Sequence, residues 1–304
     1  MSTGIRVLIR SVFSLTLLVL VAGSDFVAAQ DVLTGDWKAS TKAEDTDKIH
    51  LSFELRTEKG GKNQMGSSYD YAHLQGLSRE QAVGGGAVKF SLAREAGTID
   101  CEGSFQNGKG SGTFRFTGSQ SFVSAMKSRG FDFEKNSPAS NGGRDSANRL
   151  FAAATLHITT ALADDLLSAD FGKLEVDELF KAAIFKVDSK FMREMKASGF
   201  PNLGMEELVK ARIFKIDADF VNRVTQMGFD KESFESLVKM RIFKVTPEFI
   251  AEARNEGLTN LSVEDLVKMR IFKIDGEFIR QAKADGVPLE VEKLVQKRIG
   301  VRGN

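Results

Sequence analysis

The chain has 304 residues, 42% of them hydrophobic, and its 42 basic and 41 acidic side chains leave a formal charge of +1. This length allows a large hydrophobic core. Acids and bases are interspersed along the chain, which argues against a nucleic-acid-binding stripe and against a polybasic membrane patch. The single cysteine, Cys101, excludes an intramolecular disulfide.

Residues 1–29 have the pattern of a secretory signal peptide. Arg6 and Arg10 form a positive start, residues 11–22 form an apolar run, and residues 27–29 form a small-residue cleavage site. The run is shorter than the roughly 20 residues that a membrane span needs. We therefore expect export to the periplasm or the extracellular space, with no stable membrane insertion after cleavage. An uncleaved signal that anchors the chain in the inner membrane is the alternative.

Between residues 30 and 118 apolar and polar residues alternate, which is typical of half-buried strands. The pattern predicts a small antiparallel domain of about six strands with one solvated face, either a curled sheet or a sandwich. Cys101 falls on the apolar face of its segment, which favours a buried thiol over a reactive one. The clear strand candidates are 49–55, 88–92 and 113–116, and the weaker ones are 36–38 and 67–74.

From residue 119 to residue 304 the spacing of apolar residues becomes helical, and one segment recurs. The motif Ile-Phe-Lys followed by Val or Ile begins at residues 184, 213, 242 and 271, always 29 residues apart. Repeats of this length mark stacked supersecondary units. The sequence of each unit predicts two short helices. The first helix follows an Asp or Thr cap and ends at a glycine, and the second helix contains a Leu-Val pair.

The same register extends back to about residue 119. Asp170 stands where the other units have the helix-ending glycine, and an insertion near 136–146 is composed like a flexible loop. The expected organisation is a signal peptide (1–29), an antiparallel β domain (30–118) and an array of two-helix repeats (119–304). The expected fold class is α+β, an antiparallel sheet or sandwich followed by an α-solenoid-like array whose units bury each other's apolar faces.

No motif for catalysis or metal binding is present. His50, His73 and His157 have no second ligand at metal-site spacing, and the HExxH, GxSxG and phosphate-cradling motifs are absent. We expect His50 and His73 on strands and His157 just before a helix. The sequence therefore predicts no catalytic residue, no metal and no cofactor, and a protein that is not an enzyme.

Two alternatives to a binding protein stay open. A hydrolase or carbohydrate-active enzyme in the β domain needs a pocket that joins one of two histidines to nearby carboxylates. A small-ligand sensor needs a groove between the sheet and the helices. The residues of the hydrolase alternative are His50, His73, Asp70, Asp100 and Glu102.

Two columns of charged residues recur in the second helix of the repeats. The lysines follow a glutamate four residues earlier, which predicts an i,i+4 ion pair, and the arginines end the helix, where a cation suits the helix dipole. Internal stabilisation explains both columns. If stacking aligns the columns on one surface, they also form a candidate site for an acidic or extended partner, made of Lys210, Arg212, Lys239, Arg241, Lys268 and Arg270.

Several segments carry a family resemblance. They are the strand segments 88–90, 96–98, 102–103 and 110–116, together with the Thr-Pro-Glu-Phe-Ile repeat at 246–250. With these segments, the chain resembles the extracytoplasmic region of some bacterial BlaR1-type membrane metallopeptidase sensors. The resemblance implies a role in sensing or partner contact outside the membrane. The membrane part and the zinc-binding HExxH motif of that family are absent, so no peptidase activity carries over.

Together these observations predict a non-enzymatic exported binding or scaffold protein. The repeat array is the expected contact surface, and a protein or peptide is the expected partner. No nucleic-acid partner is expected from the balanced charge.

Overall fold

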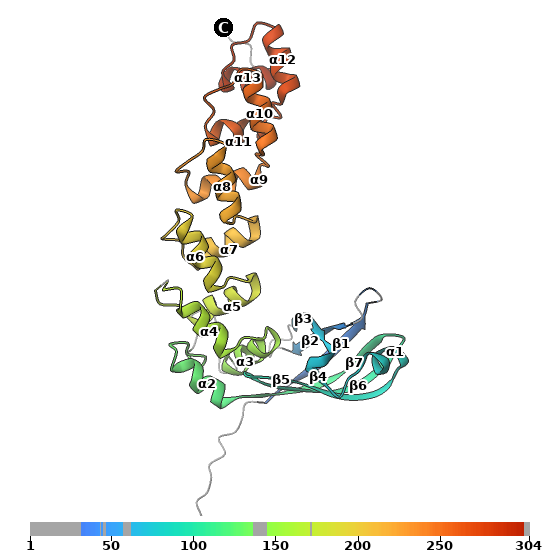
Figure 1. Cartoon of the computed structure of the whole chain (residues 1–304). Coiled ribbons are helices and arrows are strands. Elements are labelled where there is room, and N and C mark those ends of the chain that lie inside the picture. The colour runs from blue at the N-terminus through green and yellow to red at the C-terminus, as the bar shows by residue number, and fades with distance from the viewer. Residues whose placement is uncertain are drawn as a thin grey trace, which may run out of the picture. The chain divides into compact units, whose positions relative to one another are not determined.

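The computed structural model describes residues 32–42, 44, 47–56, 62–135, 145–170 and 172–300 (Figure 1). The expected signal peptide and most of the expected insertion at 136–146 lie outside these residues. The described chain is α+β: an antiparallel sheet comes first and a long helical region follows.

Seven antiparallel strands form one curled sheet, in the order β3-β2-β1-β7-β6-β5-β4 (Figure 1). Of the two arrangements predicted, the described strands therefore show the curled sheet and not the sandwich. The weak strand candidate at 36–38 lies inside β1, whereas the candidate at 67–74 is divided by a 3-10 turn, Tyr71–His73. The strands are β1 Val32–Thr41, β2 Lys48–Arg56, β3 Lys62–Asp70, β4 Leu74–Gln75, β5 Gly86–Arg94, β6 Gly97–Gln106 and β7 Lys109–Gly118.

Local sequence explains how these strands pair. Asn107 and Gly108 join β6 to β7 with φ angles of 50° and 72°. Two positive φ angles define the type I′ turn, whose twist matches that of a two-stranded hairpin. On β6, Ile99 and Cys101 are buried in the core, as their alternation with acidic residues predicts.

Helix α3 (Asp145–Thr155) packs against the sheet. The ring of Phe151 stacks on Phe114, with 5.1 Å between the ring centroids, and meets Phe53 edge-on at 5.9 Å. The buried residues form one continuous cluster that includes both the sheet and the helices. The sheet and the first helices therefore share a core, although the change of period at residue 119 suggested two separate modules.

The remaining helices follow in close succession. Among the described residues, no single helix has the length and apolar content to cross a membrane; α3 and α4 meet that criterion only as a pair, across a bend of 88°. The helices are α1 Arg79–Gly84, α2 Gln120–Lys127, α4 Thr160–Leu167, α5 Val176–Phe185, α6 Ser189–Ala197, α7 Met205–Phe214, α8 Ala218–Gln226, α9 Phe234–Ile242, α10 Pro247–Asn255, α11 Val263–Ile271, α12 Gly276–Ala284 and α13 Val291–Arg298.

The caps and ends of these helices recur with the 29-residue period. The glycine that follows each even-numbered helix from α6 to α12 has a positive φ, between 76° and 106°. Asp170 supplies the same left-handed turn after α4, with φ of 53°. At the other end, a hydroxyl or carboxylate accepts a hydrogen bond from the backbone N–H three residues later. The residues that cap in this way are Ser119, Thr159, Asp188, Asp217, Thr246 and Asp275.

The odd-numbered helices from α5 to α13 each contact the next odd-numbered helix (Figure 1). The leucines of their Leu-Val pairs are fully buried, as expected for the apolar side of a helix. Contacts between α4 and α6 and between α10 and α12 join the even-numbered helices in the same way. The buried leucines are Leu208, Leu237, Leu266 and Leu294.

Candidate functional site

The lysines of the predicted partner site form ion pairs between successive odd-numbered helices. The Nζ of Lys210 on α7 lies 2.9 Å from the Oε1 of Glu235 on α9. The glutamate four residues before it, Glu206, pairs instead with Lys181 on α5. The predicted i,i+4 pairing is therefore wrong, because the adjacent helix brings a glutamate directly opposite each lysine. The same pattern continues in the pairs Lys239–Glu264 and Lys268–Glu292.

The arginines of the predicted partner site lie over phenylalanine rings. The guanidinium carbon of Arg241 is 3.7 Å from the centroid of the Phe220 ring, and one Nη donates to the carbonyl oxygen of Lys215. Burial lowers the pKa of Arg241. Arg241, Arg270 and Arg298 thus each join their own helix to the helix before it and to the end of the preceding odd-numbered helix. The equivalent stacked pairs are Arg212–Phe191, Arg270–Phe249 and Arg298–Phe278.

All six residues of the predicted partner site therefore make contacts within the chain. They lie on three successive odd-numbered helices, α7, α9 and α11. Their positive charges are partly neutralised by glutamates or covered by aromatic stacking, so they offer a partner less free charge than the sequence suggests.

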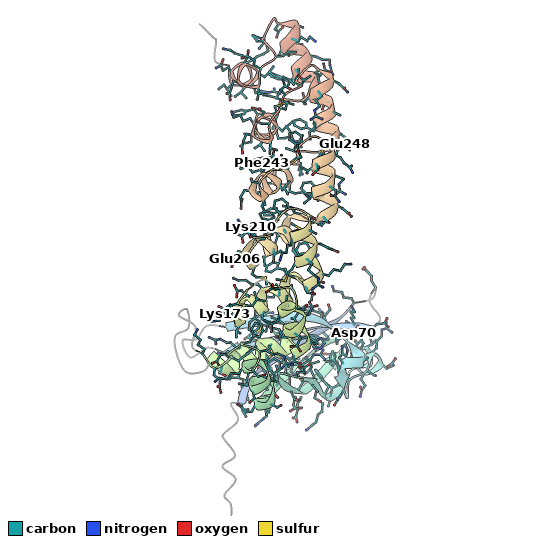
Figure 2. All side chains as sticks on the ribbon, turned by 60° about the vertical axis from the view of Figure 1, so that its left-hand side comes forward. Asp70, Lys173, Glu206, Lys210, Phe243 and Glu248 are labelled. Carbon is teal, nitrogen blue, oxygen red and sulfur yellow. The ribbon has the colours of Figure 1, made fainter. Side chains whose placement is uncertain are left out.

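A column of exposed isoleucines occupies the ends of the odd-numbered helices. Five of the eight large apolar side chains that are exposed among the described residues belong to this column. On α7, Ile213 follows Glu206 by seven residues and Lys210 by three, so helical spacing puts these side chains on one face of the helix. Figure 2 labels Glu206 and Lys210. The column, with exposed fractions of 50–55%, consists of Ile184, Ile213, Ile242, Ile271 and Ile299.

A lysine in a left-handed conformation follows each of the first four isoleucines by two residues. These lysines have φ angles of 53–59°, and their side chains are exposed. A left-handed backbone costs a non-glycine residue roughly 1–2 kcal/mol. None of the four has an ion-pair partner among the described residues. They are Lys186, Lys215, Lys244 and Lys273.

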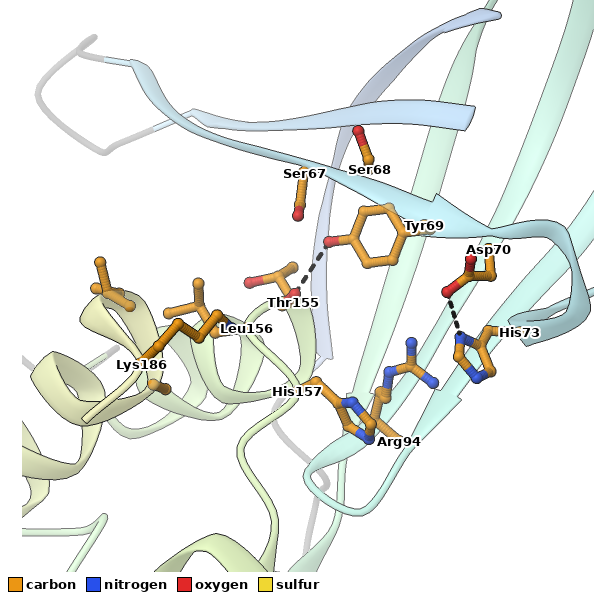
Figure 3. Close-up of a pocket in the computed structure, with 12 residues that line it drawn as sticks. Ser67, Ser68, Tyr69, Asp70, His73, Arg94, Thr155, Leu156, His157 and Lys186 are labelled. Carbon is orange, nitrogen blue, oxygen red and sulfur yellow. Dashed lines mark hydrogen bonds and ion pairs between the residues drawn. The ribbon is translucent and has the colours of Figure 1, made fainter. Parts of the chain in front are cut away.

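A pocket of about 380 Å³ lies where the end of β3 and the end of β5 meet the C-terminal ends of α3 and α5 (Figure 3). The hydroxyl of Tyr69 donates a hydrogen bond to the carbonyl oxygen of Thr155, at 3.1 Å, and so joins β3 to α3 at the pocket. Burial raises the pKa of Tyr69 to about 12, so this hydroxyl stays protonated. The polar lining also includes Asp70, Arg94 and Lys186.

Two histidines line the same pocket. The ring of His73 lies 6.4 Å from the ring of His157, between centroids, and its Nδ1 is 3.7 Å from the Oδ2 of Asp70. Figure 3 shows both rings with Arg94 at one side of the pocket. Burial lowers the pKa of His157, and the nearby Arg94 lowers it further, while Glu95 acts in the opposite direction. His157 is therefore mainly neutral at pH 7.

The pocket brings together only part of the set that a hydrolase would need. Asp70 and His73 both line it. Asp100 and Glu102 line a different hollow, on the exposed face of β6, and His50 lies on β2. The expectation that His73 lies on a strand is wrong, because it ends the 3-10 turn between β3 and β4.

Sequence reasoning missed His157 and Arg94 as pocket residues. His157 lies 29 residues before Lys186 and has the same left-handed backbone, with φ of 56°, so the repeat register contains a signal for it. No sequence pattern marks Arg94 as a pocket residue, because its position in the pocket depends on how the sheet packs against the helices.

In the part of the chain that the structure describes, no three His, Cys, Asp or Glu side chains lie close enough together to bind a metal ion. Cys101 is 1% exposed, and burial raises the pKa of its thiol. The thiolate, which is the reactive form, is therefore suppressed.

Comparison of the chain with protein-family models, with curated proteins and with solved structures found no match.

Proposed function

We propose that the chain is a non-enzymatic, exported binding or scaffold protein. In this proposal α2–α13 form a solenoid-like array of two-helix repeats of 29 residues, and the odd-numbered helices present the contact surface. The resemblance to the extracytoplasmic region of membrane metallopeptidase sensors agrees with such a role. Export rests on the signal-peptide pattern of residues 1–29.

The observation that carries the proposal is the column of half-exposed isoleucines with an unpaired lysine beside each of the first four. Large exposed apolar patches mark interaction sites, and this column holds five of the eight exposed large apolar side chains of the described residues. The lysines strengthen the case, because glycine serves the left-handed turns after α6, α8, α10 and α12 and would be less strained here. The presence of lysine at four successive turns, in place of the less strained glycine, is explained if the lysine side chain contacts the partner.

The partner that fits this surface is an amphipathic helix with acidic residues beside its apolar ones. Packed helices lie about 8–10 Å apart, so successive isoleucines are separated by about that distance. Positions i and i+7 of an α-helix are about 10.5 Å apart on one face, which matches this step. An extended strand repeats its face every 6.6–6.8 Å or so, which does not match. A second copy of this surface is disfavoured, because it would set the lysine columns against each other.

Site-specific photo-crosslinking tests the proposal. A photoreactive amino acid replaces Ile242 in the exported protein in its native envelope, and mass spectrometry identifies the crosslinked segment. We expect one partner segment with apolar residues at helical spacing and acidic residues next to them. Replacing Lys215, Lys244 and Lys273 together by Glu should abolish the crosslink, because the unpaired positive charges become negative.

The matched control places the same photoreactive group at Asn222, an exposed residue of the even-numbered helix α8. The crosslink should be absent there. Equal crosslinking from both positions, or crosslinking to lipid alone, would contradict the proposal. So would a partner segment without acidic residues.

A further inference from the structure

The pocket between the sheet and helices α3 and α5 has more cationic groups than acidic ones. Asp70 is the one carboxylate in its described lining, and it already lies 3.9 Å from the Nζ of Lys48 and 3.7 Å from the Nδ1 of His73. Arg94 and Lys186 have no ion-pair partner among the described residues. The charge of the lining is therefore not balanced from within.

Arg94 has donors that the chain does not satisfy. Its Nε is buried without a hydrogen-bond partner, and its Nη1 reaches only the carbonyl oxygen of Ala93, at 3.4 Å. A buried donor without a partner is costly, so native structures usually satisfy it. A guanidinium presents its donors in a planar fork that matches the oxygens of a carboxylate or a phosphate. The Nε atoms of Arg212 and Arg241 are likewise unsatisfied, but only Arg94 lines this pocket, where an oxyanion would satisfy its donors.

The pKa of His157 depends on the electrostatic potential in the pocket. Its backbone takes the same left-handed turn as that of Lys186, 29 residues later, and its side chain lines the pocket. Apart from burial, the groups that act on its pKa are Arg94, His73 and Lys186, which lower it, and Glu95, which raises it. The cations prevail. An anion in the pocket would reverse this balance and favour the protonated ring.

We propose that this pocket binds a small molecule through an oxyanion group, a carboxylate or a phosphate. Arg94 is the main anchor and Lys186 is the flanking cation, while His157 lies beside them as a neutral ring whose protonated form a bound anion would favour. The hydroxyl groups of Ser67 and Ser68 also line the pocket and can hydrogen-bond the rest of the ligand. A volume of about 380 Å³ lies within the range of small-molecule sites.

This site is independent of the proposed helix-binding surface. Ile184 and Lys186 border both, but the groups that select an oxyanion, Arg94 and His157, belong to the pocket alone. A failure of either proposal leaves the other unaffected, because the crosslinking experiment replaces none of the pocket residues.

NMR of the histidine side chains tests the proposal directly. The pH titration of each imidazole is recorded between about pH 5 and pH 8, the range in which histidine changes charge. It is repeated with inorganic phosphate and with succinate, against potassium chloride at equal ionic strength. We expect phosphate or succinate to raise the pKa of His157 in a saturable way, and the tighter of the two identifies the oxyanion class. His50 lies on β2 opposite Ser68 of the pocket lining, so adding either anion should move its signals less than those of His157.

Variants then assign the anchor. Arg94→Gln should weaken binding about tenfold or more, because a charge-assisted hydrogen bond is lost. Lys186→Gln, at an exposed position whose loss leaves the core intact, should weaken it by a smaller factor and serves if Arg94→Gln does not fold. The proposal is overturned if neither anion moves His157 beyond the effect of chloride. It is also overturned if His50 responds equally, or if neither variant changes the affinity.

Discussion

The guanidinium carbon of Arg241 lies 3.7 Å above the ring of Phe220, and the same side chain donates a hydrogen bond to the carbonyl oxygen of Lys215. One arginine thus joins α9 to α8 and to the C-terminal end of α7. The sequence left two interpretations of this arginine open, a cation that suits the end of its helix and a contact for a partner. The structure gives it a role in holding neighbouring helices together.

Replacement of Arg241 by Ala should therefore reduce stability. We expect a loss of about 1–3 kcal/mol in the free energy of unfolding, from the stacking and the hydrogen bond together. Urea unfolding followed by circular dichroism measures it. Arg223, exposed on α8, is the matched control, and its replacement by Ala should change stability by less than about 0.5 kcal/mol. Equal effects of the two substitutions would refute the role given to Arg241.

Substitution of a left-handed lysine should change stability and partner binding in opposite directions. Lys215→Gly should raise the free energy of unfolding by roughly 0.5–1 kcal/mol, because glycine adopts a φ of 54° without strain. Under the proposed function the same change should weaken partner crosslinking, since a free cation is lost. The reverse substitution, Gly228→Ala at a φ of 89°, should destabilise the chain. A Lys215→Gly variant that binds as well as the parent would show that the lysine is not needed.

Phe151 is the side chain through which α3 meets the sheet. Phe151→Ala should cost about 3–5 kcal/mol, because the ring is fully buried among Phe53, Phe114 and Phe116 and its removal leaves a cavity. Phe151→Leu should cost less. Thermal unfolding monitored separately by Trp37 fluorescence in the sheet and by helical circular dichroism gives the test. If the sheet and helices share one core, both signals should shift together, whereas independent shifts would mean that the two parts fold separately.

Asp165 on α4 should make stability depend on acid pH. Its carboxylate accepts hydrogen bonds from the backbone N–H of Ser189 at 2.8 Å and from the Ser189 hydroxyl at 2.7 Å, and these bonds lower its pKa below the usual 3.8. A lowered pKa in the folded state stabilises the fold above pH 3.8, and this contribution disappears as the pH falls through the folded-state value.

Asp165→Asn should accordingly be less stable than the parent at neutral pH, and the difference should shrink as the pH falls below 3.8. Urea midpoints measured from about pH 7 down to pH 2.5 or so follow this change. Asp219→Asn on α8 is the comparison, as Asp219 is an exposed acid. A difference between parent and Asp165→Asn that stays constant over this range would exclude the proposed linkage.

Much of the secondary structure was predictable because its causes are local. Thr246 and Asp275 cap helices for reasons contained within four residues, and Gly199 and Gly228 end helices because glycine tolerates a positive φ. The strand alternation likewise placed Cys101 on a buried face. The 3-10 turn at His73 was missed, because its segment alternates like a strand while the chain turns there between two edge strands.

The sequence by itself therefore determined most of the helices and strands, the 29-residue period and the buried apolar positions, because each depends on spacing along one chain. Only the tertiary structure decided that Lys210 pairs with Glu235, that Phe151 lies on the sheet and that Arg94 meets His157. These contacts join residues 25 or more positions apart. They depend on the distance and angle between packed elements, and no local spacing encodes either.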